Sequence, residues 1–475
     1  MAARPHERMA HHPARQVGGA LPRAAGAAPQ GDMNSALRSD VRPRELWGWA
    51  MYDFANSGYT TVVLTALFNA YFVTVVAGNA PWATLAWTAA LSVSYALIVA
   101  SAPIIGAFAD RHAAKKRLLV ITTLGCVLFT GLLYFAQTDT LWFALACVIM
   151  SNFFFGTGEN LIAAFLPEIA RVRSLGRVSG WGWSLGYIGG LTALGVCLMY
   201  VTWAQAQGQI AAQFVPVTML MTAGLFALSS LPTFLLLRER ALPRPAQAVG
   251  FGDAWRAVRQ SLHLLRRLPD LRRFLVCTLF YQAGIQAVII LTAVYAHQAM
   301  GFTLRQTLIL IIVVNITAAV GAFLFGYLQD RIGHVRAIAL TLVGWITTIL
   351  LAWAAREPTL FWVAANLAGL CLGATQSASR ALMGVLAPPS RLAEFYGFWG
   401  LVVKLASIAG PLTYGATTWL TGGDHRRALL LTGSYFVVGL FLLPGVRVAR
   451  GRRAALRIDR LDRIPISNPT RNNAS

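Results

Sequence analysis

The chain is organised as long apolar blocks separated by short polar connections. Twelve blocks are each about 20 residues or longer, which is the helix length that crosses a hydrocarbon core of ~30 Å. In lipid, backbone polar groups must be satisfied within the segment, and the alternating pattern of a membrane β-barrel is absent. The pattern therefore predicts an all-α, polytopic membrane protein with twelve transmembrane helices. The blocks cover residues 47–76, 83–109, 117–137, 141–166, 178–201, 213–237, 272–297, 303–329, 335–354, 358–386, 394–420 and 427–446.

The composition agrees with this prediction. The 475 residues are 56% hydrophobic and only 12% charged, and the mean hydropathy is +0.58. A soluble globular protein is closer to ~25% charged. All five cysteines fall inside the predicted spans without a metal-ligand spacing, so we expect small core residues rather than a disulfide framework or a metal site.

The net charge of +22 is distributed unevenly between the two sides of the predicted membrane. If the N-terminus is cytoplasmic, the two tails and the loops on that side hold 34 of the 40 lysines and arginines, and the opposite side holds four. This asymmetry follows the positive-inside rule. We therefore expect both termini in the cytoplasm, a location in a cell membrane, with a bacterial inner membrane favoured, and no nucleic-acid partner.

An internal repeat divides the chain into two related halves. The motif G-x-x-x-D-R occurs after the second and eighth blocks, at an offset of 220 residues. A second pair of anchors, Glu159 with Pro167 and Arg380 with Pro388, has an offset of 221. Parallel repeats of this kind are typical of transporters, whose substrate site lies near the midplane between the halves. The two copies of the motif contain Gly106, Asp110 and Arg111, and Gly326, Asp330 and Arg331.

The expected domains follow from the repeat. Residues 46–238 and 272–448 form two six-helix halves, and residues 239–271 form a cytoplasmic linker with an amphipathic helix that we expect to be a strut. Residues 1–45 are expected to be a disordered cytoplasmic tail, with Met33 as an alternative start, and residues 449–475 a basic cytoplasmic tail.

The repeated motif has a physical rationale at a cytoplasmic gate. Gly106 and Asp110, like Gly326 and Asp330, lie four residues apart and share a helix face. The glycine allows another helix to approach closely, and the carboxylate can pair with an arginine or cap a helix N-terminus. Such contacts would form in one conformation and break in another. The alternative interpretation is a plain charged turn.

Four ionisable residues lie within predicted spans, in the cytoplasmic half of the membrane: Asp53, Glu159, Arg380 and Lys404. Facing lipid would cost each at least ~2.5–3.5 kcal/mol, so we expect them to face a cavity and one another. In a functional interpretation, Asp53 or Glu159 binds a proton, and the two cations bind an anionic group of the substrate. In a structural one, the four form fixed ion pairs that join the halves. The polar neighbours Asn56, Asn160 and Gln376 complete the candidate site.

Glycines and tryptophans mark two further features of the predicted spans. Span five is rich in glycine from Gly180 to Gly190, and span eleven contains Gly397, Gly400 and Gly410. Small residues permit close helix contact and bending, although ordinary tight packing explains any single glycine. Trp181, Trp183 and Trp399 either line a substrate pocket or belong to the core and the membrane interface.

The repeated loops resemble the signature loop of the major facilitator superfamily, over residues 46–448. YDFANSGY, GENLIAAFLPEIA, GRVSGWGWSLGYIGG, QSASRALMGVLAP and AEFYGFWGLVVKLASIAGP further resemble the branch of the autophagy-related vacuolar amino-acid effluxer and its bacterial relatives. The resemblance implies alternating access, export of small solutes and a central cavity lined by spans one, four, seven and ten. The family pattern has an acidic residue before a glycine in span seven. Here Ala283 precedes Gly284, and Gln282 and Gln286 would supply neutral hydrogen bonds instead.

No catalytic or nucleotide-binding motif is present, which argues against an enzyme or an ATP-driven pump. We expect a secondary active transporter without a cofactor, driven by a proton gradient, that acts as a monomer in the lipid bilayer. The cations and the resemblance favour an amino acid or a related zwitterion or anion, moved by efflux. A channel, a translocase of lipid or another amphiphile, and a non-transporting membrane receptor of the same fold are the alternatives.

Overall fold

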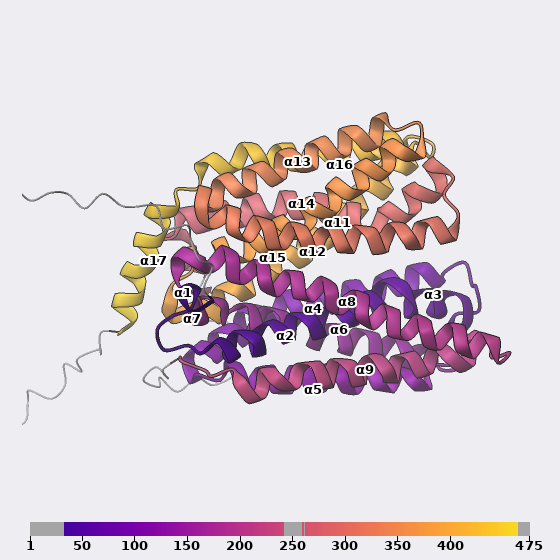
Figure 1. The fold of residues 1–475 in the computed structure, drawn as a ribbon, viewed down its shortest axis with the longest axis horizontal. Helices are drawn as coiled ribbons and strands as arrows, with labels where there is room; N and C mark the ends of the chain where they lie inside the picture. The colour runs from indigo at the N-terminus through magenta and orange to yellow at the C-terminus, as the bar shows by residue number, and fades with distance from the viewer. Residues whose placement is uncertain (1–32, 242–258, 261, 464–475) are drawn as a thin grey trace, which may run out of the picture.

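The computed structural model describes residues 33–241, 259–260 and 262–463, and these form a bundle of long helices (Figure 1). Within this part of the chain the only β-type pairing is a single bridge between Leu37 and Ala170. The prediction of an all-α membrane protein is confirmed. The long helices after the first span are α4 (Ala83–His112), α5 (Lys115–Leu132), α6 (Leu141–Ala163), α8 (Leu175–Ala206), α9 (Ala211–Leu236), α11 (Pro269–Met300), α12 (Leu304–Ile332), α13 (His334–Ala354), α14 (Pro358–Leu386), α15 (Leu392–Leu420) and α16 (His425–Leu442).

Twelve long helical segments occupy the twelve predicted spans. Eleven of them, in the described residues, are long and apolar enough to cross a membrane. The remaining one is α11, a 32-residue helix at the position of span seven. It has no charged residue from Phe274 to Ala296, a stretch long enough to cross the hydrocarbon core.

The first span is not a uniform α-helix. It begins as α2 (Pro43–Tyr59), continues as a π-helix (Thr60–Ala66), returns to α-helix in α3 (Phe68–Tyr71), and ends as a second π-helix (Phe72–Val76). In the first π-segment the Thr65 hydroxyl donates to the Thr60 carbonyl, five residues earlier, at 3.1 Å. Inserted π-turns of this type often lie at functional sites.

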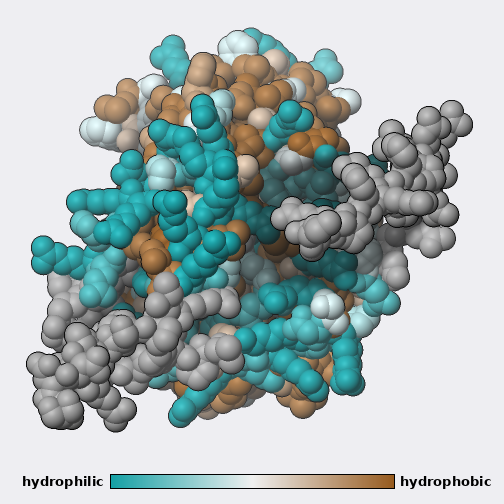
Figure 2. Space-filling view, turned by 90° about the vertical axis from the view of Figure 1, so that its left-hand side faces the viewer, coloured by the Kyte–Doolittle hydropathy of each residue, from teal (hydrophilic) through white to brown (hydrophobic). Residues whose placement is uncertain are grey.

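The two halves lie side by side with their helices roughly parallel to one long axis (Figure 1). The N-terminal half, from α2 to α9, is drawn in indigo to magenta, and the C-terminal half, from α11 to α16, in salmon to yellow. The short helices α1 (Met33–Ala36) and α7 (Leu166–Ile169) lie at the same end as α17 (Val448–Arg463). We call this the terminus-bearing end. Figure 2 views it directly and shows that hydrophilic side chains gather there.

The prediction of a disordered tail over residues 1–45 is wrong for its last part, because residues 33–45 pack on the N-terminal half. The backbone N–H of Arg38 donates to the Ile169 carbonyl at 3.1 Å, and that of Arg171 donates to the Ala36 carbonyl at 2.9 Å. Ala36 and Leu37 are fully buried. Two buried apolar residues and one strand-like bridge order a segment whose composition indicated disorder. Residues 1–32 lie outside the described part.

The predicted basic tail, residues 449–475, begins with a helix, α17. Gly451, Ala455 and Ile458 lie on its buried face. The Asp270 carboxylate at the start of α11 accepts two hydrogen bonds from Arg450, both at 2.7 Å. This contact fixes α17 against the C-terminal half.

The predicted amphipathic helix of the linker lies largely outside the described residues. The described part of the linker is helical at residues 259–260 and 262–266, and Leu268 is buried where the chain enters α11. The expected role of the linker as a strut stays a prediction.

Candidate functional site

A cavity of about 600 Å³ lies between the two halves. Its lining contains Asp53 and Arg380 at one limit, and residues near the opposite ends of the helices, such as Asn69, Tyr295 and Phe361, at the other. The cavity therefore extends from the ion-pair layer towards the end remote from the termini. Its volume is within the range of sites for small organic ligands, which is roughly 300–1,000 Å³.

Asp53 and Arg380 form a buried ion pair that joins the halves. Arg380 Nη1 donates to Asp53 Oδ2 at 2.7 Å, and Arg380 Nε and Nη2 donate to the hydroxyl and the carbonyl of Ser179 at 3.1 and 2.9 Å. The guanidinium carbon lies 4.7 Å from the ring centroid of Trp49 and 5.4 Å from that of Trp183. The guanidinium thus donates to three acceptors and lies against two aromatic rings, which fixes α2, α8 and α14 to one another.

Glu159 and Lys404 form a second ion pair between the halves, and it is looser. Lys404 Nζ lies 3.4 Å from Glu159 Oε2, and 32% of the Glu159 side chain is exposed to the cavity. The lysine Nζ also lies 5.4 Å from the ring centroid of Tyr95 and 5.7 Å from that of Phe155. A long ion pair with an exposed carboxylate is open to competition from a charged ligand, whereas the Asp53–Arg380 pair is enclosed.

The three predicted polar neighbours also line the cavity, and two of them have unsatisfied atoms. Asn56 Oδ1 and Asn160 Nδ2 are buried without a hydrogen-bond partner in the described part of the chain. Asn160 lies directly against Gly400, where the atoms of a larger residue would overlap its amide. Gln376 Oε1 accepts a hydrogen bond from Gln282 Nε2 at 2.8 Å. All seven predicted binding residues therefore lie around one cavity.

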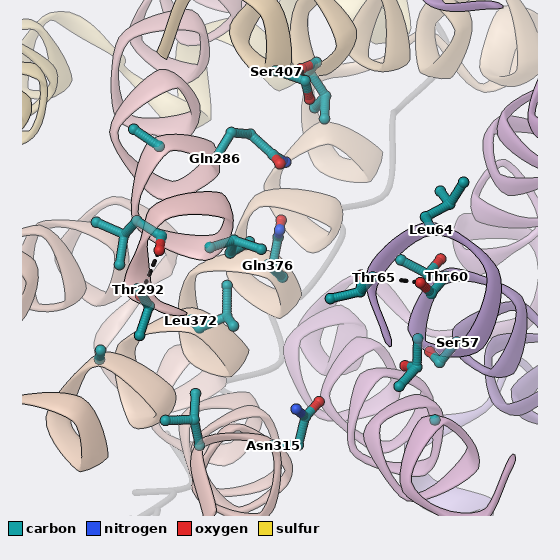
Figure 3. A pocket seen from close by; sticks show the side chains of 18 of the residues that line it. Ser57, Thr60, Leu64, Thr65, Gln286, Thr292, Asn315, Leu372, Gln376 and Ser407 are labelled. Carbon is teal, nitrogen blue, oxygen red and sulfur yellow. Dashed lines mark hydrogen bonds between the residues drawn. The ribbon is translucent and has the colours of Figure 1, made fainter. Parts of the chain in front are cut away.

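Beyond the ion pairs, the polar part of the cavity lining consists mainly of hydroxyls and amides. Figure 3 shows Ser57, Thr60 and Thr65 from the first span facing Gln286 and Gln376 from the C-terminal half. These groups carry no formal charge. In the described lining, the charged side chains are the four of the two ion pairs.

The first copy of the repeated motif closes the terminus-bearing end on one side of the cavity. The Asp110 carboxylate accepts hydrogen bonds from the backbone N–H groups of Ala393, at 3.1 Å, and Glu394, at 2.8 Å. These groups lie in the first turn of α15, so an acidic residue of the N-terminal half caps a helix of the C-terminal half. Lys115, itself fully buried, lies between Asp110, at 3.9 Å, and Glu168.

The second copy makes the equivalent contact in the opposite direction. The Asp330 carboxylate accepts hydrogen bonds from the backbone N–H of Gly176, at 2.9 Å, and of Arg177, at 3.1 Å, in the first turn of α8. Arg177 Nε adds a charged hydrogen bond at 3.2 Å. Both predicted carboxylates therefore cap a helix of the other half, as the gate interpretation of the motif requires.

The motif glycines lie where the helices of the two halves touch. A Cβ atom at Gly326 would lie 2.8 Å from the Gly176 carbonyl oxygen, and one at Gly106 would overlap the Ala393 carbonyl. The expected close approach is confirmed at both positions. Arg111 and Arg331 make no hydrogen bond or ion pair with the described part of the chain, so their part in the gate stays a prediction.

The sequence did not identify several residues that complete these contacts. Arg177 and Lys115 fall in predicted polar connections, where the charge asymmetry alone accounted for basic residues. Trp49 and Tyr95 were assigned to no site, because an aromatic residue in a membrane span is ordinary. Of the candidate tryptophans, Trp183 and Trp399 line the cavity, and Trp181 lies outside its lining. The presence of Arg177 one residue after Gly176 was the one available signal for a partner of Asp330.

The fold and the cavity lined by both halves define the class of the protein, which is a multi-pass membrane transporter of the major facilitator superfamily. The model of the Major Facilitator Superfamily matches residues 3–194. The model described as "Vacuole effluxer Atg22 like" matches residues 172–456, which is more than half of the chain. The chain belongs to this Atg22-like family of the superfamily.

Curated relatives and solved structures agree with this assignment. An uncharacterized transporter of the superfamily from Bacillus subtilis, YxiO, is 25% identical, and the match covers 84% of this chain and 94% of the relative. Autophagy-related protein 22-1 of Aspergillus fumigatus is 26% identical over 64% of this chain and 54% of its own length, so the chain spans about half of that fungal protein. The Escherichia coli fucose:proton symporter FucP has the same fold, with a TM-score of 0.66, 14% identity, and coverage of 86% of this chain and 100% of FucP.

Proposed function

We propose that this protein is a secondary active transporter that moves a small zwitterionic solute, such as an amino acid, or a small anion. The observation that supports this proposal most directly is the Glu159–Lys404 pair, which is 3.4 Å long and partly exposed to the cavity. A solute carboxylate can replace Glu159 beside Lys404, and a solute ammonium can replace Lys404 beside Glu159. Zwitterionic solutes satisfy both residues at once and leave neither charge unpaired.

Alternating access would use the contacts at the terminus-bearing end. If the termini are cytoplasmic, as the charge asymmetry indicates, the structure corresponds to an outward-facing state with a closed cytoplasmic gate. Opening towards the cytoplasm requires the caps at Asp110 and Asp330 to break. The enclosed Asp53–Arg380 pair would keep the inner part of the cavity ordered in the outward-facing state, and we assign it a positioning role rather than direct contact with the solute.

Proton coupling and efflux are further parts of the proposal. The Glu159 carboxylate is partly exposed to the cavity. It can therefore separate from Lys404 and bind a proton instead, as the surroundings of the cavity change. A proton gradient would then drive transport without a bound cofactor. The family description supports efflux, and the charge distribution supports a bacterial inner membrane with cytoplasmic termini. A monomeric transporter is also part of the proposal.

The test is flux of a labelled amino-acid mixture into and out of proteoliposomes, with and without an imposed pH gradient. We expect gradient-dependent flux in the wild type and a loss of at least tenfold in Glu159→Gln. Glu357→Gln, at the exposed start of α14, is the matched control and should behave as wild type. Equal flux in Glu159→Gln and the wild type would contradict the role of Glu159, and absence of flux for every amino acid would contradict the substrate class.

A translocase of lipids or other amphiphiles is the second candidate. It is favoured by the apolar part of the cavity lining, which includes Ile289, Ile311, Val314 and Leu372 on the C-terminal half. Transfer of a fluorescent lipid between the leaflets of proteoliposomes, without amino-acid flux, would support this candidate over the first.

A further inference from the structure

The C-terminal half contributes three side-chain amides to one region of the cavity. Gln286 on α11, Asn315 on α12 and Gln376 on α14 all line it, and Figure 3 shows their amide groups directed into the same space. Three separate helices thus place one kind of functional group together. Ordinary core packing does not require this, because buried amides must find hydrogen-bond partners.

Each amide keeps hydrogen-bonding capacity for a ligand. Gln376 Oε1 accepts from Gln282, which leaves the Gln376 amino group available. Asn315 Nδ2 donates to the Ile311 carbonyl at 2.8 Å, which leaves Oδ1 as an acceptor. Gln286 makes no side-chain hydrogen bond with the described part of the chain. These three side chains, which we call the amide wall, therefore offer hydrogen-bond donors and acceptors without a charge.

The facing wall of the first span supplies acceptors. The hydroxyls of Ser57, Thr60 and Thr65 donate their hydrogens to backbone carbonyls of their own helix. Each hydroxyl oxygen still has lone pairs that can accept a hydrogen bond. A group with N–H or O–H donors would be satisfied between the two walls, whereas an apolar group would leave these acceptors dependent on water.

Two of the three amides lie at a different depth from the charged residues. Gln376 lies about 15 Å from the terminus-bearing end of α14, which is the level of the charged residues. At ~1.5 Å per residue, Gln286 and Asn315 lie about 25 Å from the terminus-bearing ends of α11 and α12. Lys404 lies about 18 Å from the corresponding end of α15. A solute whose charged groups lie beside Lys404 and Glu159 would therefore extend its remaining atoms about 7 Å further, to the level of Gln286 and Asn315.

We propose that the preferred solutes carry an uncharged hydrogen-bonding group, an amide or a hydroxyl, next to a zwitterionic head, and that Gln286 and Asn315 bind this group. The inference rests on the proposed transport of small zwitterions and adds the chemistry of their side chain. A charged side chain is disfavoured in this region, because the four charged groups of the cavity already neutralise one another and lie nearer the terminus-bearing end. Sites built to hydrogen-bond a substrate group discriminate strongly against analogues that lack the group.

The experiment compares amino acids of matched shape. Asparagine is compared with leucine, threonine with valine, and glutamine with methionine, each as a competitor of labelled-substrate counterflow in proteoliposomes. Binding of each compound to the purified protein is measured in parallel by thermal stabilisation, a readout that does not require transport. We expect the polar member of each pair to compete at least tenfold better and to stabilise the protein at lower concentration.

Variants assign the preference to the amide wall. Gln286→Leu and Asn315→Leu should reduce the preference at least threefold while keeping the flux of the apolar members. Gln205→Leu, at the exposed end of α8, removes an amide elsewhere and should leave the preference unchanged. If the apolar members bind and are carried as well as the polar ones, this inference is overturned and the proposed function stands. If no amino acid binds or moves, the proposed function itself fails.

Discussion

At the scale of single residues, the two ion pairs of the cavity differ in how far water reaches them. The side chain of Arg380 is 4% exposed and that of Asp53 is 11% exposed. The Glu159 side chain is 32% exposed and its distance from Lys404 is longer. Removal of one member of an enclosed pair leaves an uncompensated buried charge, whereas water can solvate the remaining member of an accessible pair. The first pair should therefore govern stability, and the second should govern binding.

This difference predicts unequal costs for two similar substitutions. Arg380→Met should lower the free energy of unfolding by about 3–5 kcal/mol, because it strands the Asp53 carboxylate. Lys404→Met should cost clearly less, because Glu159 stays reachable from the cavity. Unfolding in detergent, followed for both variants and the wild type, measures the costs. Adding Asp53→Asn to Arg380→Met should recover part of the loss, and equal losses in the two single variants would contradict the distinction.

The sequence identified all four charged residues but not their pairing. Because a charged side chain that faces lipid is energetically costly, we expected all four to face a cavity and one another. They are Asp53, Glu159, Arg380 and Lys404. Which carboxylate meets which cation depends on how α2 and α14 pack against α8 and how α6 packs against α15, which spacing along the chain does not specify. The aromatic rings around the cations were missed for the same reason.

At the scale of elements, the long apolar helices were predictable and the short peripheral segments were not. Residues 33–45 and α17 gain their order from contacts with residues distant in sequence, such as Ala170 and Asp270. Their own composition is typical of disordered or basic tails. The π-helical segments of the first span were also not predicted, because a threonine-rich apolar sequence is compatible with ordinary α-helix.

Docking of α17 should depend on pH through carboxylates that pair with arginines. One is Asp270, and the other is Asp462 of α17, which accepts two hydrogen bonds from Arg391, both at 2.8 Å. The hydrogen bonds from Arg450 hold the pKa of Asp270 below its ordinary value of 3.8. A carboxylate with a depressed pKa in the docked state stabilises docking above its ordinary value, and this stabilisation is lost as the pH falls through the depressed value. Docking should therefore be constant from pH 8 to about 5 and weaken below about 4.

A spin label at Leu456, on the exposed face of α17, should report this change as increased mobility when the pH is lowered from 7 to 2. Asp270→Asn removes one of the two titrating groups, so its label should be more mobile already at pH 7 and respond less to acid. A label whose mobility is independent of pH in the wild type would show that other contacts are sufficient to hold α17.

At the scale of the whole molecule, the internal repeat produces two equivalent helix-capping contacts between the halves. Asp110 caps α15 and Asp330 caps α8, and each carboxylate comes from the half opposite to the helix that it caps. Gly180 of α8 packs against Ala322 of α12, where a Cβ atom would lie 2.5 Å from the carbonyl oxygen. The closed state thus depends on close backbone contact as well as on the two caps.

A larger residue at this contact should shift the conformational equilibrium. Gly180→Val should separate the halves at the terminus-bearing end, because backbone atoms of α12 occupy the space of its side chain. Gly195→Val, in the same helix with no atom within 4 Å, is the matched control. Spin labels at Arg117 and Arg336, both exposed at this end, should give longer distances in Gly180→Val and unchanged distances in Gly195→Val. Unchanged distances in both would mean that the contact does not restrain closure.

The sequence by itself determined the twelve membrane helices, the two-half repeat, the gate carboxylates and the residues of the candidate site. These features follow from local rules: apolar length, the cost of charge in lipid, and the repetition of one motif. Only the tertiary structure decided that Asp53 pairs with Arg380 and Glu159 with Lys404, that the gate carboxylates cap α15 and α8, and that three amides share one wall. Each of these depends on which helix faces meet across the two halves, and that choice is made by the packing of the whole bundle.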